Sequence, residues 1–363
     1  MKLEYPGQQP GSAASLLPVE APDPVPGPGE ALVQVEACGF CHHDLLVMKG
    51  LLRRGVKPGV ILGHEISGIV LLVGNDVTTV RAGDRVVTLL VSACGRCDRC
   101  LQGREHRCRN GAGIGHSRDG GFAEYVAVSE FSLVPVPDDV DLAAAALLAC
   151  PMGVALQGLQ QAAQVHPGET VLVTGAGGGL GAHAVQLGAA LGCRVIAVTS
   201  SPEKRAALSG LGAHEVLETG PLDFSEVVLA LTQDQGADVV IDTVGSPLFP
   251  STWRSLAQFG RWVMLGEVAG RPVQLDPAEV IFRDARILGA SGVSRAQVQQ
   301  VAKMVSQGLI KPLIGRTLPM EEAATALELL SDRSILGRVL LAPPGRPTQA
   351  NSDKNAERKG NDG

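Results

Sequence analysis

The sequence lacks both a long apolar run and a concentration of charge of either sign. No stretch of about 18 consecutive apolar residues occurs, and the first residues contain no apolar segment followed by a small-residue cleavage site. We therefore expect no membrane span, no secretion and a cytoplasmic location. Because the net charge of −6 is spread along the chain, we expect no binding to nucleic acid or to anionic lipid.

The sequence also lacks the short, secreted character that would make its eight cysteines a disulfide framework. With 363 residues the chain is long enough for two domains, because single cores stop growing at roughly 250–300 residues. We therefore expect these cysteines to be reduced and to form metal sites in a reducing compartment.

The pattern of residues changes near residue 168. Before it, β-rich runs (31–35, 66–73, 84–88, 122–128) alternate with Gly and Pro turns, which predicts an irregular, barrel-like β domain. After it, strands and helices alternate over 170–173, 178–191, 194–198, 201–211, 216–217, 224–232, 239–242 and 262–265, which predicts an α/β fold with a doubly wound parallel sheet.

The end of the chain is expected to return to the first domain. Segments 297–306 and 320–330 resemble helices, and 337–341 resembles a strand. We predict one domain over 1–150 and 291–343, a dinucleotide-binding domain over 151–290, and a disordered tail over 344–363, which has nothing to bury.

Four cysteines lie close together in a polar segment. Cys94, Cys97, Cys100 and Cys108 have the spacing C-x2-C-x2-C-x7-C. Four thiolates form a closed tetrahedral zinc site, and a closed site has a structural role. The alternatives are inert cysteines, a pair of disulfides or an iron–sulfur cluster, which a similar cysteine run can hold.

Three further residues are candidate ligands of a catalytic zinc, which keeps three protein ligands and one open position. They are Cys41 in Cys41-His42-His43-Asp44, His64 in Gly63-His64-Glu65, and Cys150 before Pro151. Each one alone is a weak signal, because a lone buried cysteine more often acts as a small hydrophobic residue. We interpret Cys38 and Cys193, which match no ligand position, as small hydrophobic residues that pack in the core.

The order of these motifs, with 120–125 (GGFAEY) and a later glycine-rich turn, resembles zinc-dependent medium-chain alcohol dehydrogenases from about Ala31 to Leu341. The resemblance implies a GroES-like catalytic domain with a zinc lobe over 94–108, and a Rossmann domain. It implies that Cys41, His64 and Cys150 hold the catalytic zinc, with Glu65 approaching it transiently. Asp44 would then accept the ring N–H of His64 and fix its tautomer.

A glycine-rich turn lies between a buried apolar strand and an apolar helix, over 171–181 (VLVTGAGGGLG). Glycines let the backbone approach a pyrophosphate, and a helix N-terminus offers free N–H groups. Ala176 replaces the first glycine of G-x-G-x-x-G, a variant also seen in the family. The predicted cofactor contacts are Ala176, Gly178, Gly179, Leu180 and Gly181; the alternative is a purely structural turn.

The next strand ends in Thr199-Ser200-Ser201, where an acidic residue would bind the ribose hydroxyls of NAD(H). Without that carboxylate, and with Lys204 and Arg205 downstream, we expect NADP(H) to be favoured over NAD(H), unless these cations only solvate a helix face. By the resemblance, Arg338 and His42 would reach the cofactor phosphates.

The resemblance implies hydride transfer between a nicotinamide and an alcohol or carbonyl group that is bound at zinc. The family's proton relay is altered, since His43 replaces a hydroxyl residue and Leu46 replaces a histidine. We therefore expect His43 to act in proton transfer or substrate orientation, or only to fill space. One alternative is reduction of an activated C=C bond in an enoyl thioester; another is a non-enzymatic dinucleotide-binding protein. We expect two zinc ions, a small-molecule substrate, and a homodimer or homotetramer.

Overall fold

The computed structural model describes residues 1–4, 16–219 and 223–348. The chain divides into two compact units. The first comprises Met1–Cys150, Val293–Ser306 and Ile314–Gly363; the second comprises Pro151–Gly292 and Gln307–Leu313. The expected return segment 291–343 is therefore interrupted. Leu313 donates its N–H to His183 Nε2 (2.9 Å), and Gln186 exchanges two hydrogen bonds with the Lys311 backbone, which holds Gln307–Leu313 in the second unit.

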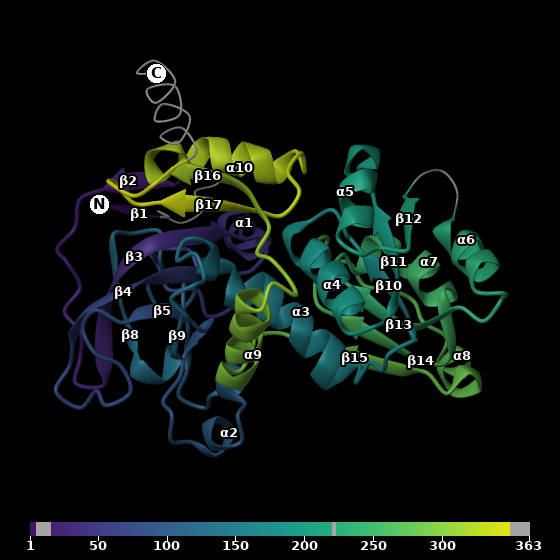
Figure 1. Ribbon diagram of the computed structural model, residues 1–363, viewed down its shortest axis with the longest axis horizontal. Helices are drawn as coiled ribbons and strands as arrows, with labels where there is room; N and C mark the ends of the chain where they lie inside the picture. The colour runs from purple at the N-terminus through teal and green to yellow at the C-terminus, as the bar shows by residue number, and fades with distance from the viewer. Residues whose placement is uncertain (5–15, 220–222, 349–363) are drawn as a thin grey trace. The chain divides into compact units, whose positions relative to one another are not determined.

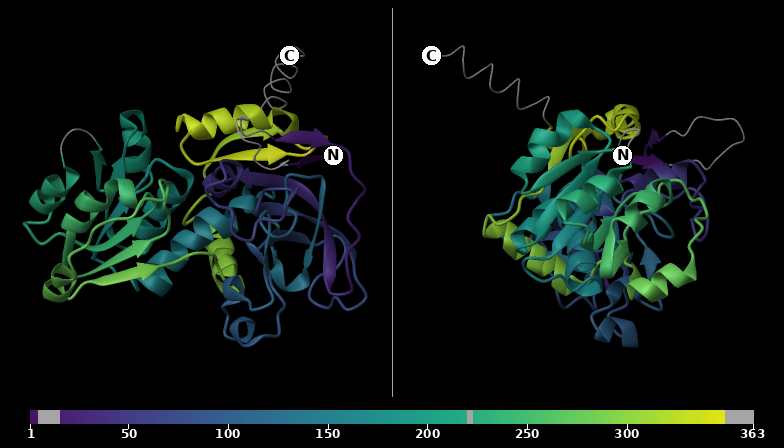
Figure 2. Two further views of the ribbon diagram at one scale, coloured as in Figure 1. Left: turned by 180° about the vertical axis from the view of Figure 1, so that it is seen from behind. Right: turned by 90° about the vertical axis from the view of Figure 1, so that its right-hand side faces the viewer.

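The first unit is built on a mainly antiparallel sheet of seven strands, ordered β16-β17-β3-β4-β5-β9 with β8 also paired to β3. C-terminal strands lie beside N-terminal ones (Figures 1 and 2). The strands are β3 (Glu30–Phe40), β4 (Glu65–Val73), β5 (Arg85–Thr88), β8 (Tyr125–Ser129), β9 (Leu133–Pro135), β16 (Ile314–Pro319) and β17 (Arg338–Ala342). Two small sheets pair β1 (Lys2–Glu4) with β2 (Leu17–Val19) and β6 (Val91–Ser92) with β7 (Ala112–Gly113).

Strand β3 is central, and eight of its eleven residues, all apolar or glycine, are buried, as expected for a strand with partners on both edges. Its core partners include Phe122, whose ring packs edge-on against that of Phe40 with the ring centroids 5.3 Å apart. The helices of this unit are α1 (His42–Met48), α2 (Asp98–Leu101), α9 (Arg295–Ser306) and α10 (Ala323–Ser331), with short 3-10 turns at Glu105–Arg107, Glu130–Ser132, Ala144–Leu147 and Met320–Glu322.

The second unit contains a parallel sheet of six strands, ordered β12-β11-β10-β13-β14-β15. The strands are β10 (Thr170–Thr174), β11 (Arg194–Thr199), β12 (Glu215–Glu218), β13 (Ala237–Asp242), β14 (Leu256–Met264) and β15 (Arg286–Gly289). This is the order of a doubly wound dinucleotide-binding fold, with its switch point between β10 and β13. The predicted α/β fold class is confirmed.

Helices cover both faces of this sheet (Figure 1). They are α4 (Gly179–Ala190), a turn at Pro202–Lys204 with α5 (Arg205–Gly210), α6 (Phe224–Leu231), a turn at Ser246–Leu248 with α7 (Phe249–Arg254), and α8 (Pro277–Arg283). One core joins Leu172, Val240 and Trp262 of the sheet to Phe224 of α6 and Trp253 of α7. Burial of these apolar side chains on α6 and α7 holds the helices to the sheet.

A helical segment over Leu148–Gly153, α3 (Val154–Leu156) and Gln157–Ala162 was not expected from the sequence. Its side chains are mostly buried and it contains Pro151, so a polar face by which a helix is recognised is confined to Gln157, Gln160 and Gln161 at its end. Among the described residues, no helix is long and apolar enough to cross a membrane.

The structure describes the first residues of the tail that was expected to be disordered. Residues 344–348 are described, and the Arg346 guanidinium lies 3.1 Å from Glu36 Oε2. This ion pair connects the start of the segment to β3, and the disorder expected over 344–363 stays a prediction. The rest of the tail, 349–363, lies outside the described residues.

Candidate active site and metal centres

The first unit brings together four side chains from three parts of the chain. Cys41 lies between β3 and α1, His64 directly precedes β4, Glu65 is the first residue of β4, and Cys150 lies in the helical segment Leu148–Gly153. Their candidate ligand atoms all lie within 4.8 Å of one another, and Cys41, His64 and Glu65 are buried. We call these four residues the active-site metal group.

Asp44 holds two sides of this group together from a fully buried position. Its carboxylate accepts hydrogen bonds from the backbone N–H of Cys41 (2.9 Å) and of Gly63 (3.2 Å), and lies 3.5 Å from His64 Nδ1. The Nδ1 atom therefore faces a carboxylate, and Nε2 is the nitrogen left for a metal. Gly63 cannot carry a side chain here, because a Cβ would lie 2.6 Å from Phe122 and 2.7 Å from Cys38 Sγ.

Arg338 of β17 lies against the same group. Its guanidinium is 2.8 Å from Glu65 Oε1 and 3.9 Å from Cys150 Sγ, and it is buried. Burial raises the pKa of Glu65 to about 7, although the Arg338 charge opposes this shift. The structure thus places Arg338 beside the metal group, and its contact with cofactor phosphates stays a prediction.

The donor set fits a zinc ion. The hydrogen bond between the two thiols lowers the pKa of Cys41 well below its usual value and raises that of Cys150, so Cys41 is the first thiolate. Two sulfurs, one imidazole and a neighbouring carboxylate are ligands that a borderline-soft cation prefers. Glu65 Oε2 has no hydrogen-bond partner among the described residues, so it is available to a cation.

His43 lies next to the metal group on α1. Its ring meets the His64 ring edge-on, with centroids 5.0 Å apart, and its buried Nδ1 has no partner within the described part of the chain. Burial lowers the pKa of His43 to about 4, and the His64 charge adds to this shift. The ring is therefore neutral near pH 7.

His42, the other imidazole of α1, has a different environment. Burial lowers its pKa, which the Cys41 charge opposes and the charges of Lys49, Arg333 and Arg338 reinforce. Three cations around one neutral ring form a positive region that suits an anionic group. The sequence singled out only Arg338 among these cations.

His116 was missed by the sequence analysis. Its ring lies 5.3 Å from that of His43, although the two residues are far apart in the sequence. Its surroundings, Gly113-Ile114-Gly115-His116-Ser117, contain no ligand spacing or other motif. Only the folded chain reveals it as part of this site.

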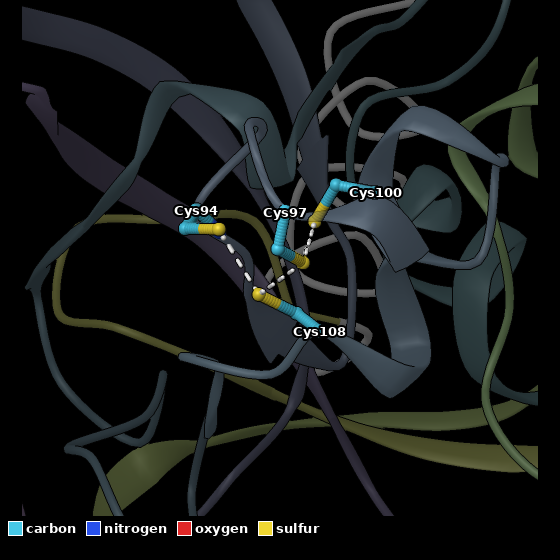
Figure 3. A group of neighbouring side chains, drawn as sticks. All are labelled: Cys94, Cys97, Cys100 and Cys108. Atoms are coloured by element: carbon cyan, nitrogen blue, oxygen red, sulfur yellow. Dashed lines mark hydrogen bonds between the residues drawn. The ribbon is translucent and has the colours of Figure 1, made fainter.

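The four cysteines of the predicted zinc lobe converge around one point (Figure 3). Their Sγ atoms lie within 4.8 Å of one another, with Cys97 3.6 Å from Cys100 and 3.8 Å from Cys108. All eight cysteines are free, so no disulfide forms. A two-point ion pair between Asp98 and Arg109 joins the start of α2 to the residue after Cys108. Four converging thiols fit a closed structural zinc site.

The second unit places the glycine-rich turn at the switch point of its sheet. β10 ends at Thr174, Gly175 has φ +62°, and α4 begins at Gly179 after Gly178. A Cβ on Gly181 would lie 2.2 Å from the Gly175 carbonyl oxygen, so only glycine lets the turn and helix approach this closely. Ala176 is buried, and Leu180 is partly exposed in the first turn of α4. Free N–H groups at this end of α4 fit a pyrophosphate.

Thr199 ends β11 beside this turn and is buried, whereas Ser200 is exposed. Lys204 donates a hydrogen bond to the Gly177 carbonyl (3.1 Å), so its ammonium group lies against the glycine-rich turn. Burial lowers the pKa of Lys204, and the Glu203 charge opposes that shift. Arg205 instead pairs with Glu218 on β12 (3.3 Å).

A fully buried acid at the switch point was also missed from the sequence. Asp242, the last residue of β13, accepts hydrogen bonds from Thr174 Oγ1 (2.6 Å), Trp262 Nε1 (3.1 Å), and the backbone of Val244 and Gly245. These bonds tie the ends of β10 and β13 together beneath the glycine-rich turn.

Two family models match the chain. The alcohol dehydrogenase GroES-like domain covers residues 27–138, and the zinc-binding dehydrogenase domain covers residues 179–307.

Acryloyl-coenzyme A reductase of Metallosphaera sedula is 38% identical over 323 residues, which are 89% of this chain and 95% of the relative. NAD-dependent alcohol dehydrogenase of Saccharolobus solfataricus is 31% identical over 342 residues, 92% of this chain and 97% of the relative. The crystal structure of AibC matches with a TM-score of 0.87 and 38% identity, covering 94% of this chain and 95% of that one.

Proposed function

Because this chain belongs to the zinc-type medium-chain dehydrogenase/reductase family, we propose that it is an NADPH-dependent reductase of the C=C bond of a 2-enoyl thioester. The observation that carries this proposal is the environment of His43. A neutral, buried imidazole stands where relatives that oxidise alcohols place a hydroxyl group, and Leu46 stands in place of the relay histidine. Reduction of a C=C bond does not need that relay. The similarity to acryloyl-coenzyme A reductases supports the same reaction.

The proposed reaction balances with one hydride and one proton. The hydride from NADPH forms a C–H bond at the β-carbon, the C=C π-pair moves toward the thioester carbonyl, and a proton from water forms the C–H bond at the α-carbon. The products are a saturated thioester and NADP⁺. When bound, zinc supplies Lewis acidity and the nicotinamide supplies the hydride.

The chain's own residues would hold and orient these groups. Cys41, His64 and Cys150 would bind the zinc ion, and Glu65 is close enough to replace an outgoing ligand. Asp44 would keep His64 in the tautomer that leaves Nε2 for the metal. Because the pKa of His43 is about 4, its role in this proposal is to orient the substrate by hydrogen bonding.

We propose NADPH over NADH because no carboxylate stands at the end of β11. Thr199 and Ser200 leave room for a 2′-phosphate, and the ammonium group of Lys204 lies at the same turn. His42 and Arg338, with the cations near them, would meet the cofactor phosphates.

Interconversion of an alcohol and a carbonyl compound is the second candidate. The three-ligand set Cys41, His64 and Cys150 suits it, as does similarity to an alcohol dehydrogenase.

A substrate panel distinguishes the two reactions. The zinc-loaded enzyme is assayed with short 2-enoyl thioesters, the matching aldehydes and the matching alcohols, each with NADP(H) and NAD(H). We expect kcat/KM to be highest for an enoyl thioester with NADPH. Faster turnover of aldehydes or alcohols would instead select the second candidate.

A further inference from the structure

Hydrogen bonds between His116 and a surface loop over residues 53–61, called the clamped loop below, fix the orientation of the His116 ring. The His116 ring Nε2 lies 2.9 Å from the Arg54 carbonyl oxygen, and Lys57 N–H donates to the His116 carbonyl at 2.8 Å. Asp119 binds the same loop through Lys57 Nζ (2.8 Å) and the backbone N–H of Ile61 (3.1 Å). The ring therefore lies in a hydrogen-bonded contact between two segments that are distant in the sequence.

This clamp determines which ring nitrogen of His116 carries a proton. A carbonyl oxygen can only accept, so Nε2 must donate to Arg54, and in the neutral ring Nδ1 is then a bare acceptor. Nδ1 is buried and has no hydrogen-bond partner within residues 1–4, 16–219 and 223–348. An unpaired buried acceptor is unfavourable, which points to a donor supplied by a ligand.

The position of the ring indicates which part of a ligand would reach it. The ring of His43 lies between those of His64 and His116. Its centroid is 5.0 Å from that of His64, which belongs to the metal group, and 5.3 Å from that of His116. In a coenzyme A thioester, the first amide nitrogen of the pantetheine arm is about 5 Å from the thioester carbonyl carbon by standard bond lengths. Aldehydes, ketones and simple alkyl thioesters have no N–H group at that distance.

We propose that His116 Nδ1 accepts a hydrogen bond from this amide and so selects pantetheine thioesters as substrates. The inference rests on the enoyl thioester reductase function proposed above. The clamped loop also carries Arg53 and Arg54, both exposed, and the Arg54 side chain has no partner in the described part of the chain. The net charge of the chain is −6, so it would repel a phosphorylated substrate overall. An exposed cation at this loop would attract the phosphate groups of such a substrate locally.

The test assays two substrates with the wild type and with two near-isosteric variants of His116. An enoyl N-acetylcysteamine thioester has the amide N–H, whereas the matching S-ethyl thioester lacks it. His116→Gln keeps a donor where Nε2 contacts Arg54 but has no acceptor in place of Nδ1. His116→Asn places an amide oxygen near the Nδ1 position and gives up the Arg54 contact. His166→Gln, in an exposed histidine of the second unit, is the control.

We expect the zinc-loaded wild type to prefer the amide-bearing thioester, and His116→Gln to lose this preference by roughly fivefold, the effect of one neutral hydrogen bond. The loss should fall on KM rather than kcat, because the contact is the same in the ground and transition states. His116→Asn should keep most of the preference. Calorimetry with a saturated coenzyme A thioester should show the same ranking, with the wild type binding most tightly, His116→Asn next and His116→Gln most weakly.

Three outcomes would overturn the inference. If Gln preserves the preference and Asn abolishes it, His116 is only a clamp for the loop. If the wild type reduces both thioesters equally well, the function stands and the amide contact does not exist. If the wild type reduces neither thioester, the proposed function is wrong and the inference fails with it.

Discussion

At the scale of residues, the active-site metal group shows how one buried carboxylate organises a site. Asp44 connects the start of α1, the backbone before His64 and the His64 ring. The sequence resemblance predicted its contact with His64, but not its two backbone hydrogen bonds. Those bonds depend on Gly63 approaching α1, which the sequence around Asp44 does not encode.

His43 provides the most direct test at this scale. We expect His43→Ala to lower kcat by on the order of a hundredfold, because the substrate loses an orienting hydrogen bond and is misplaced beside the metal group. Zinc content by elemental analysis and the NADPH dissociation constant should not change. His43→Asn, which keeps a polar atom near the Nδ1 position, should recover part of the loss. Wild-type turnover by the alanine variant between about pH 5.5 and 8.5, around the ordinary histidine pKa, would remove His43 from the mechanism.

Thr199 tests the cofactor preference. A carboxylate at this position would repel a 2′-phosphate and accept the ribose hydroxyls, so Thr199→Asp should move the ratio of kcat/KM values toward NADH by at least about tenfold, or 1.4 kcal/mol. Thr199→Asn has nearly the same shape without the charge and should leave the ratio near that of the wild type. An equal shift in both variants would attribute the effect to shape, and a wild-type preference for NADH would refute the proposal.

At the scale of elements, the turn between β10 and α4 depends on close backbone contact. Gly181 lies where a Cβ would be 2.2 Å from the Gly175 oxygen, whereas the nearest atom to a Cβ on Gly178 is the same oxygen at 3.4 Å. The two glycines of the motif therefore have different roles. Gly181 allows the packing of the turn on the helix, and Gly178 leaves the exposed side of the turn open.

This difference predicts unequal effects of two alanine substitutions. We expect Gly181→Ala to destabilise the second unit by about 1–3 kcal/mol, as overpacking does, and Gly178→Ala to leave its stability almost unchanged. Both tryptophans, Trp253 and Trp262, lie in this unit, so tryptophan emission during urea unfolding reports its stability. Equal destabilisation by the two substitutions would contradict this account.

The sequence predicted elements best where they have one buried face or lie in the centre of a sheet. β10, β11 and α4 lie within about two residues of their predicted bounds. β15 and β16 were missed because each is an edge strand with few buried residues. β14 begins six residues before its predicted start, and Phe259 within it has φ +59°, which interrupts the alternating pattern.

At the scale of the whole molecule, both candidate metal centres belong to the first unit and the dinucleotide turn belongs to the second. The four-cysteine lobe is polar and has few buried residues, so a bound ion would replace the apolar core that it lacks. The active-site metal group instead lies in a unit that already has an extensive apolar core. Loss of the two ions should therefore have different consequences.

We expect two zinc ions per chain by elemental analysis. Cys97→Ser should retain one ion and lower the melting temperature, because a structural site contributes to folding. Cys150→Ser should also retain one ion, but with a near-normal melting temperature and little activity. Iron in place of zinc, or a single ion in the carefully purified wild type, would contradict this assignment, and equal melting temperatures of the two variants would contradict the division of roles.

The sequence by itself determined the residue types of the site and the class of each domain. Cysteine spacing within 94–108, the glycine-rich turn and the alternation of strands and helices are local patterns, so they can be recognised without knowing how the chain folds. Tertiary structure decided which side chains meet. His116 reaches His43, Arg338 reaches Glu65, and Gln307–Leu313 joins the second unit through contacts between segments far apart in the sequence. Such contacts depend on the packing and register of whole elements, which no local pattern encodes.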